Sequence, residues 1–110
     1  MVTIMSEILK RKITLFPKQN QVMKHLGENI KLARKRRHFT QKLISERADI
    51  SPVTLRKIEK GDHTVAIGHY LKVLTALNLA EDLTKVALDD ELGRKLQDAA
   101  LLGQNQKRTK

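Results

Sequence analysis

The sequence contains no cysteine and only three aromatic residues, Phe16, Phe39 and Tyr70. Without cysteine there is no disulfide, no thiolate nucleophile and no cysteine-based zinc site, which fits a reducing cytosol. With so few aromatic side chains, the core must consist of Leu, Ile, Val and Ala, which favours a small helical domain over a β-sandwich. The apolar runs are only a few residues long, so we expect neither a membrane span nor a secretory signal, and cytoplasmic residence is the default.

A length of 110 residues predicts one compact domain with short tails. Positive charge dominates, with 22 Lys and Arg against 12 Asp and Glu, a net charge of +10. Such an excess attracts polyanions, either nucleic acid or an anionic membrane surface, although a solvated surface can also be basic.

The charge is concentrated in one part of the chain. Residues 18–60 hold 12 basic and 4 acidic residues, a net charge of +8, whereas residues 61–102 hold 4 basic and 7 acidic residues, a net charge of −3. This division indicates one surface for phosphates and another for protein contacts. A membrane-surface peptide is disfavoured, because the basic segment carries a coherent core pattern.

Apolar periodicity predicts an all-α chain. The first helix is expected from about residue 18 to the Arg36-Arg37-His38 run, and the fourth over residues 66–77. A short fifth helix is expected over residues 79–86, and a last one after the acidic residues 89–91. The expected inward positions of the first and fourth helices are Val22, Leu26, Ile30 and Ala33, and Ile67, Leu71, Leu74 and Leu77.

Two short helices between these carry clear end signals. Thr40 is a candidate N-cap for a helix that ends near Ala48. Ser51 followed by Pro52 indicates the start of the next helix, for which Gly61 is the stop. The inward positions are Leu43, Ile44, Ala48, Ile50, Leu55 and Ile58. Two short helices joined by a turn of three or four residues form a helix-turn-helix, whose second helix can enter a major groove.

The stretch from about His25 to Leu79 resembles the Xre or phage-repressor type of helix-turn-helix domain. The similarity depends on Thr40-Gln41, the Leu43…Ala48 spacing, Ile50-Ser51, the Ile58-Glu59-Lys60-Gly61 close and the Leu71…Leu74…Leu77 helix. It implies an all-α, lambda-repressor-like DNA-binding domain of five to six helices, with a C-terminal helical extension for dimerisation. It also implies that Gln41 contacts DNA backbone or a base edge. In the turn, Asp49 stands where many family members have glycine; aspartate tolerates the left-handed conformation better than most residues.

The segment from Leu77 to Gln97 is similar to HipB-type antitoxins, which are homodimeric autorepressors of an operon that encodes a HipA-like serine/threonine kinase toxin. This similarity implies operator DNA, a second copy and such a kinase as partners. The residues expected at the dimer contact are apolar and more numerous than one small domain needs: Leu83, Val86, Leu88, Leu92 and Leu96. Two recognition helices would then lie about 34 Å apart, one turn of duplex.

The expected organisation is an N-terminal arm, either extended or disordered, over residues 1–17, a DNA-binding domain over 18–80, a helical extension for dimer and partner contacts over 81–102 and a disordered basic tail over 103–110. Base contacts are expected at the start and outer face of the third helix, at Ser51, Pro52, Val53, Thr54, Arg56 and Lys57. The expected phosphate contacts are Thr40, Gln41, Lys42, Lys60 and some of Lys31, Arg34, Lys35, Arg36 and Arg37. His63 and Thr64 are also placed to reach phosphate.

Other interpretations compete with these. The Lys31–Arg37 run also fits a solvated helix end, where cations are favoured. Arg47 is expected to pair with Glu59 inside the domain rather than to contact DNA. Asp89, Asp90 and Glu91 are interpreted as helix-start charge rather than as a catalytic pair or cation site.

The four histidines lack metal-ligand spacing and the glycines form no phosphate loop, so we expect no metal, no cofactor and no enzymatic activity. The alternative to a repressor is a protein-interaction module that stabilises or inhibits a toxin or kinase complex, with little sequence-specific DNA binding.

Overall fold

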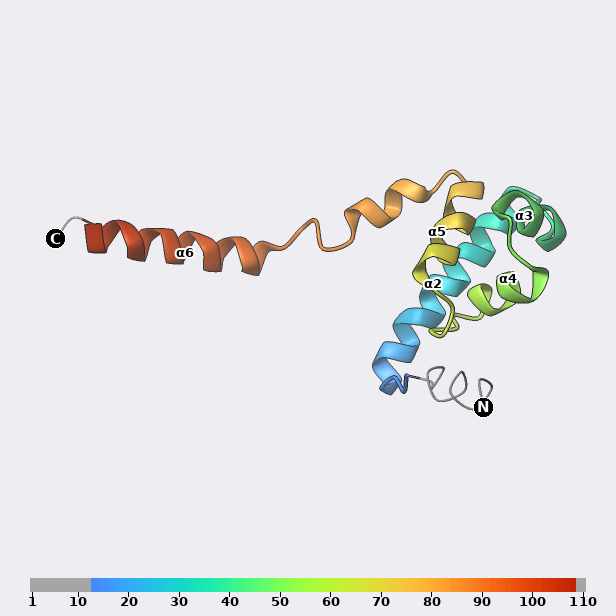
Figure 1. Cartoon of the computed structure of the whole chain (residues 1–110), viewed down its shortest axis with the longest axis horizontal. Helices are drawn as coiled ribbons and strands as arrows, with labels where there is room; N and C mark the ends of the chain where they lie inside the picture. Colours follow the sequence, from blue (N-terminus) through green and yellow to red (C-terminus); the bar gives the residue numbers. More distant parts are fainter. Residues whose placement is uncertain (1–12, 109–110) are drawn as a thin grey trace, which may run out of the picture. The chain divides into compact units, whose positions relative to one another are not determined.

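The structure is a computed structural model that describes residues 13–108 (Figure 1). These residues form six helical segments and no strand, which confirms the all-α prediction. The segments are α2 (Pro17–Arg36), α3 (Gln41–Ala48), α4 (Pro52–Glu59), α5 (Ile67–Ala76), the 3-10 helix η1 (Ala80–Lys85) and α6 (Glu91–Arg108). They fall into two units, one ending at Ala80 and one beginning at Glu81.

In the first unit, α3 packs against both α4 and α5, and α2 packs against α4 (Figure 1). The core lies between these four helices and is aliphatic apart from one tyrosine, as the composition requires. Its buried members are Ile30, Ala33, Ile44, Ala48, Leu55, Ile58, Tyr70, Val73, Leu74 and Leu77.

The long helix α2 begins one residue before the expected start, with Pro17 in the first turn and Phe16 in an extended conformation before it. The Phe16 N–H donates to the Gln19 side chain at 3.0 Å, which satisfies an amide that the helix itself cannot pair. The expected arm otherwise falls mostly on residues 1–12, outside the described residues. Val22 was expected to face the core and is 68% exposed, because the side of α2 that meets α4 is centred on Gly27 and Ile30.

The prediction for α5 was correct for Leu74 and Leu77, which are buried, and wrong for the other two positions. Ile67 is 74% exposed and Leu71 is 42% exposed, whereas Tyr70 and Val73 are buried. Burial of Tyr70 is possible because its hydroxyl donates to the carbonyl oxygen of Asp62 at 2.6 Å, so the polar end keeps a partner.

Four helices are followed, within two residues, by a residue with positive φ: His38, Asp49, Gly61 and Asn78. After each helix, two backbone amides close back on the last turn, as in the Schellman motif. After α4, for example, the Gly61 N–H donates to Ile58 O and the Asp62 N–H donates to Lys57 O. The predicted stop at Gly61 is confirmed.

The second unit contains most of η1 and all of α6. The predicted fifth helix is present as the shorter 3-10 helix. The prediction of a disordered tail was wrong over residues 103–108, because α6 continues to Arg108. No proline interrupts this stretch, and basic residues at a helix C-terminus interact favourably with the helix dipole. Residues 109 and 110 lie outside the described residues.

Candidate nucleic-acid interface

Helix α3 starts at the predicted cap. The Thr40 hydroxyl accepts a hydrogen bond from the Leu43 N–H at 3.1 Å, and its backbone is extended. Thr40 and Lys42 are exposed and Gln41 is partly exposed, so polar groups surround this helix N-terminus. A helix N-terminus with free amides attracts anions such as phosphate.

The turn between α3 and α4 passes through Asp49, which has φ 55° and ψ 50°. The Asp49 N–H donates to Glu46 O at 3.2 Å and the Ile50 N–H donates to Ser45 O at 3.0 Å. The left-handed conformation inferred at this position is therefore present without glycine. The turn brings α4 against α3 and directs its outer surface to solvent.

Helix α4 starts at the predicted cap and proline. The Ser51 hydroxyl accepts from the Thr54 N–H at 3.0 Å, and Pro52 occupies the first turn. Leu55 and Ile58 are fully buried and anchor the helix. The opposite side is exposed and carries Pro52, Val53, Arg56, Lys57 and Lys60.

A buried ion pair joins α2 to α4. Arg34 Nε lies 2.7 Å from Glu59 Oε2, and Arg34 Nη2 donates to Glu59 Oε1 at 3.1 Å. Arg34 Nη1 also donates to Phe39 O at 2.9 Å, and Gln41 Nε2 donates to Glu59 Oε1 at 3.0 Å. This cluster fixes α2, α3 and α4 relative to one another, because each buried charge is held by directional hydrogen bonds.

The cluster corrects two predictions. Arg34 was placed among the phosphate contacts, but only 8% of its surface is exposed and its guanidinium is committed to Glu59. Arg47 was expected to be the partner of Glu59, a position that Arg34 holds instead. The Arg47 guanidinium lies 4.9 Å from the centroid of the Phe39 ring, a cation–π contact. The sequence did not single out Arg34 as the partner of Glu59, because several other basic residues lie next to it at the end of α2.

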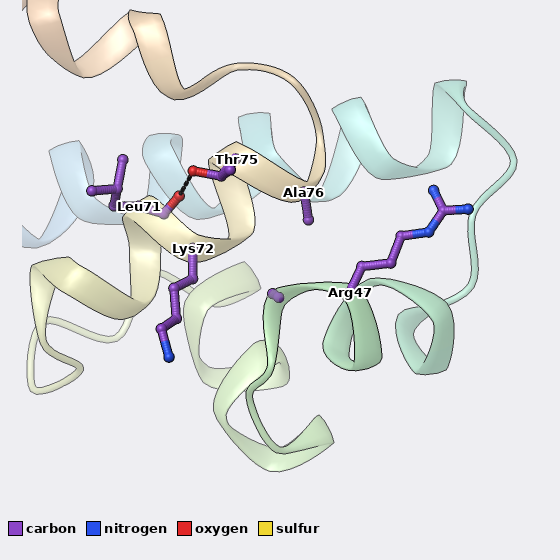
Figure 2. A pocket seen from close by; sticks show the side chains of 6 residues that line it. Arg47, Leu71, Lys72, Thr75 and Ala76 are labelled. Atoms are coloured by element: carbon purple, nitrogen blue, oxygen red, sulfur yellow. Dashed lines mark hydrogen bonds between the residues drawn. The ribbon is translucent and has the colours of Figure 1, made fainter.

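Arg47 also lines an open groove of about 420 Å³ between α3 and α5 (Figure 2). Lys72 and Leu71 contribute from α5, where the Thr75 hydroxyl donates to Leu71 O at 2.8 Å. The Arg47 and Lys72 side chains extend in different directions in Figure 2.

A glycine contact that sequence reasoning missed sets the distance between α2 and the end of α4. A Cβ atom on Gly27 would lie 2.5 Å from the Gly61 amide nitrogen and 2.6 Å from Ile58 O. On Gly61 it would lie 2.3 Å from Met23 O. The two backbones therefore touch, and the only local signal is a glycine inside a helical pattern.

The basic run at the end of α2 divides into two groups. Arg37 Nη1 donates to Ala33 O at 2.9 Å, which supports the helix-end interpretation for this residue. Lys35 and Arg36 are exposed and Lys31 is partly exposed. Their contact with phosphate stays a prediction.

In the loop after α4, the Thr64 N–H and hydroxyl both donate to Asp62 Oδ1, at 2.8 and 2.6 Å. These bonds lower the pKa of Asp62. Burial raises the pKa of Tyr70, whose hydroxyl bonds to the same loop, to about 12. His63 Nε2 contacts Ile13 O, so both residues expected to reach phosphate have intramolecular partners.

The second unit presents apolar side chains to solvent. Among the expected dimer contacts, Leu83 is partly exposed. The other four are 63–69% exposed: Val86, Leu88, Leu92 and Leu96. On α6, positions 92 and 96 are one turn apart and therefore share a face.

The acidic residues 89–91 take the predicted helix-start roles. Asp90 Oδ1 accepts from the Gly93 N–H at 3.0 Å and caps α6. Asp89 pairs with Arg94 at 2.9 Å, and Glu91 pairs with Lys95 at 3.2 Å. Among residues 13–108, no group of three or more His, Cys, Asp or Glu is placed to hold a metal ion. No helix in that range is both long and apolar enough to cross a membrane.

A helix-turn-helix family model matches residues 30–84, which is half of the chain. The match includes α3, α4, α5 and their caps, and it begins in the second half of α2. Among curated proteins, none matches the chain.

Proposed function

The chain belongs to the Xre-type helix-turn-helix family of DNA-binding regulators, and on this premise we propose that it is a sequence-specific transcriptional repressor of double-stranded operator DNA. The observation that carries the proposal is the two-sided character of α4. Leu55 and Ile58 are fully buried, while Val53, Arg56 and Lys57 face solvent. A helix that is anchored on one side and cationic on the other fits a major groove.

The proposed contacts divide into two sets. Base edges meet Ser51, Pro52, Val53, Thr54, Arg56 and Lys57, among which Arg56 and Lys57 are suited to donate to guanine O6 and N7. Phosphates meet Thr40, Gln41, Lys42 and Lys60, with Lys35 and Arg36 at the end of α2. The Gln41 side chain already donates to Glu59. We therefore expect phosphate to be bound at this position by backbone N–H groups in the first turn of α3.

The experiment is a binding titration against upstream DNA at several salt concentrations. Arg56→Ala and Lys57→Ala should relax base preference, and Arg36→Ala should weaken binding to all sequences alike. Lys72→Ala is the matched control, because it removes one exposed charge from α5, a helix that carries none of the proposed contacts. Unchanged footprints for the three test variants would contradict the assignment.

We also propose that the second unit forms a homodimer contact. The support is a set of exposed apolar side chains in this unit, Val86, Leu88, Leu92 and Leu96. Exposed apolar patches of this kind mark protein–protein contacts, and a second copy of the unit could cover them. Light scattering at micromolar protein should give twice the chain mass, and Leu92→Ala/Leu96→Ala should shift the mass towards that of one chain. A concentration-independent monomer of the unsubstituted chain would count against dimerisation.

The finer proposal is an antitoxin that represses its own operon and binds a HipA-like serine/threonine kinase in the cytoplasm. Its support is the resemblance of residues 77–97 to HipB-type antitoxins, together with the net charge of −3 over residues 61–102. Co-expression with the product of the adjacent reading frame tests it: the two proteins should purify together and kinase toxicity should fall.

The second candidate is a protein-interaction module, which the exposed leucines of the second unit also favour. The salt dependence distinguishes the two. Selective binding that weakens steeply with salt supports the repressor, whereas equal and weak binding to every duplex supports the interaction module.

A further inference from the structure

The first turn of α4 has few polar groups left for a ligand. The Ser51 hydroxyl accepts from the Thr54 N–H at 3.0 Å and lies 2.9 Å from the Thr54 hydroxyl, so these two side chains bond to each other. Pro52 has no N–H to donate. The hydroxyl groups of both side chains at this helix start are therefore engaged in the cap.

Beside the ring of Pro52, Val53 is the apolar side chain that this turn presents. Its side chain is 50% exposed, whereas Leu55 and Ile58 on the opposite side are fully buried. Valine in a helix holds one strongly preferred rotamer, so its methyl groups have a fixed direction. Its exposed neighbours Arg56 and Lys57 on the same helix are cationic.

An exposed apolar side chain with cationic neighbours can contact an apolar group on a ligand that is otherwise anionic. On the major-groove edges of DNA, that feature is the C5-methyl group of thymine, since the other distinguishing groups are hydrogen-bond donors and acceptors. The surrounding phosphates account for the cations.

We propose that Val53 is a specificity-determining residue that contacts a thymine methyl group, so that thymine is preferred over cytosine at the base pair facing the first turn of α4. This inference rests on the proposed function. It adds which chemical group is read there, and by which side chain.

The test uses the full chain and a duplex that it selects from a randomised pool. Each thymine of that duplex is replaced in turn by deoxyuridine, which lacks only the methyl group. At one thymine in each bound half-site, replacement should weaken binding about fourfold, the effect of one methyl group withdrawn from an apolar contact. In Val53→Ala, replacement at that thymine should have no effect.

Val22→Ala is the control, because it makes the same change at a valine of α2 that is 68% exposed. It should keep the full sensitivity to deoxyuridine, and circular dichroism should show all three proteins folded. If the chain selects a sequence but every thymine responds equally in Val53→Ala and in the unsubstituted protein, the inference is wrong and the proposed function stands. If the chain selects no sequence, the proposed function fails and the inference fails with it.

Discussion

Arg34 and Glu59 form a buried ion pair, with 2.7 Å between Nε and Oε2, that ties the last turn of the long helix α2 to the end of α4. Gln41 and the carbonyl of Phe39 complete their hydrogen bonds. The same side chains that satisfy two buried charges thus hold the proposed recognition helix in place. Stability and DNA affinity should therefore change together when the pair is broken.

Glu59→Gln should lower the free energy of unfolding by about 3–5 kcal/mol, because it leaves the Arg34 charge buried without a carboxylate. Urea denaturation followed by circular dichroism measures this. Glu46→Gln, at an exposed glutamate of α3, should change the value by less than about 0.5 kcal/mol. Arg34→Met/Glu59→Met should cost less than Glu59→Gln, and a larger loss in this double variant would contradict the role of the unpaired charge.

Gly27→Ala should destabilise the protein by about 1–3 kcal/mol, because the new methyl group would fall 2.5 Å from the Gly61 nitrogen and force α2 away from α4. Gly68→Ala is the matched control on α5, where a Cβ meets nothing within 4 Å. Alanine is the better helix former, so this variant should be as stable as the parent or more stable. Equal thermal melting of the two variants would show that the glycine contact is unimportant.

Asp49→Gly should stabilise the protein by roughly 0.5 kcal/mol, since glycine takes the left-handed conformation of the turn at φ 55° without a steric penalty. Gly61→Ala tests the reverse change at φ 75°, where the added Cβ would also meet Met23 O. Gly61→Ala should lower the free energy of unfolding by more than Asp49→Gly raises it. Chemical denaturation compares them, and a loss of stability in Asp49→Gly would mean that the aspartate side chain has a further role.

The single tyrosine permits a direct pH measurement, because the chain has no tryptophan. Burial raises the pKa of Tyr70 to about 12, so phenolate absorbance should appear near pH 12 in the folded protein and near pH 10 in denaturant. A folded-state pKa above the unfolded value favours folding below pH 10, and this contribution is lost as the pH rises through 12.

Tyr70→Phe should therefore show a smaller fall in stability between pH 10 and 12 than the parent protein. The buried hydroxyl donates to Asp62 O at 2.6 Å, a bond that the phenolate cannot make. A phenolate transition at pH 10 in the folded protein would contradict this burial.

The helix boundaries were the most predictable features. Thr40 caps α3, Ser51 and Pro52 start α4, and Gly61 ends it, because each signal acts on backbone amides a few residues away. The same local logic predicted the acidic start of α6. Periodicity was less informative, since the apolar residues of α5 allow more than one inward face.

The exposed residues of α4 were predictable, because the caps and the apolar pattern of this short helix define its outer side. The pairing of a cation with a carboxylate distant in sequence was not predictable. Arg34 and Arg36 look alike in the chain, yet Arg34 is buried against Glu59, 25 residues away, and Arg36 is exposed. Nothing local distinguishes them.

The sequence by itself therefore determined the all-α class, the helix-turn-helix and the residues that cap its helices, because caps and turns depend on neighbouring backbone groups. Only the tertiary structure decided that Arg34 rather than Arg47 pairs with Glu59 and that Tyr70 rather than Leu71 enters the core. It also decided that Gly27 meets Gly61. These outcomes depend on which helix faces meet, and that is set by the packing of the whole unit rather than by any one segment.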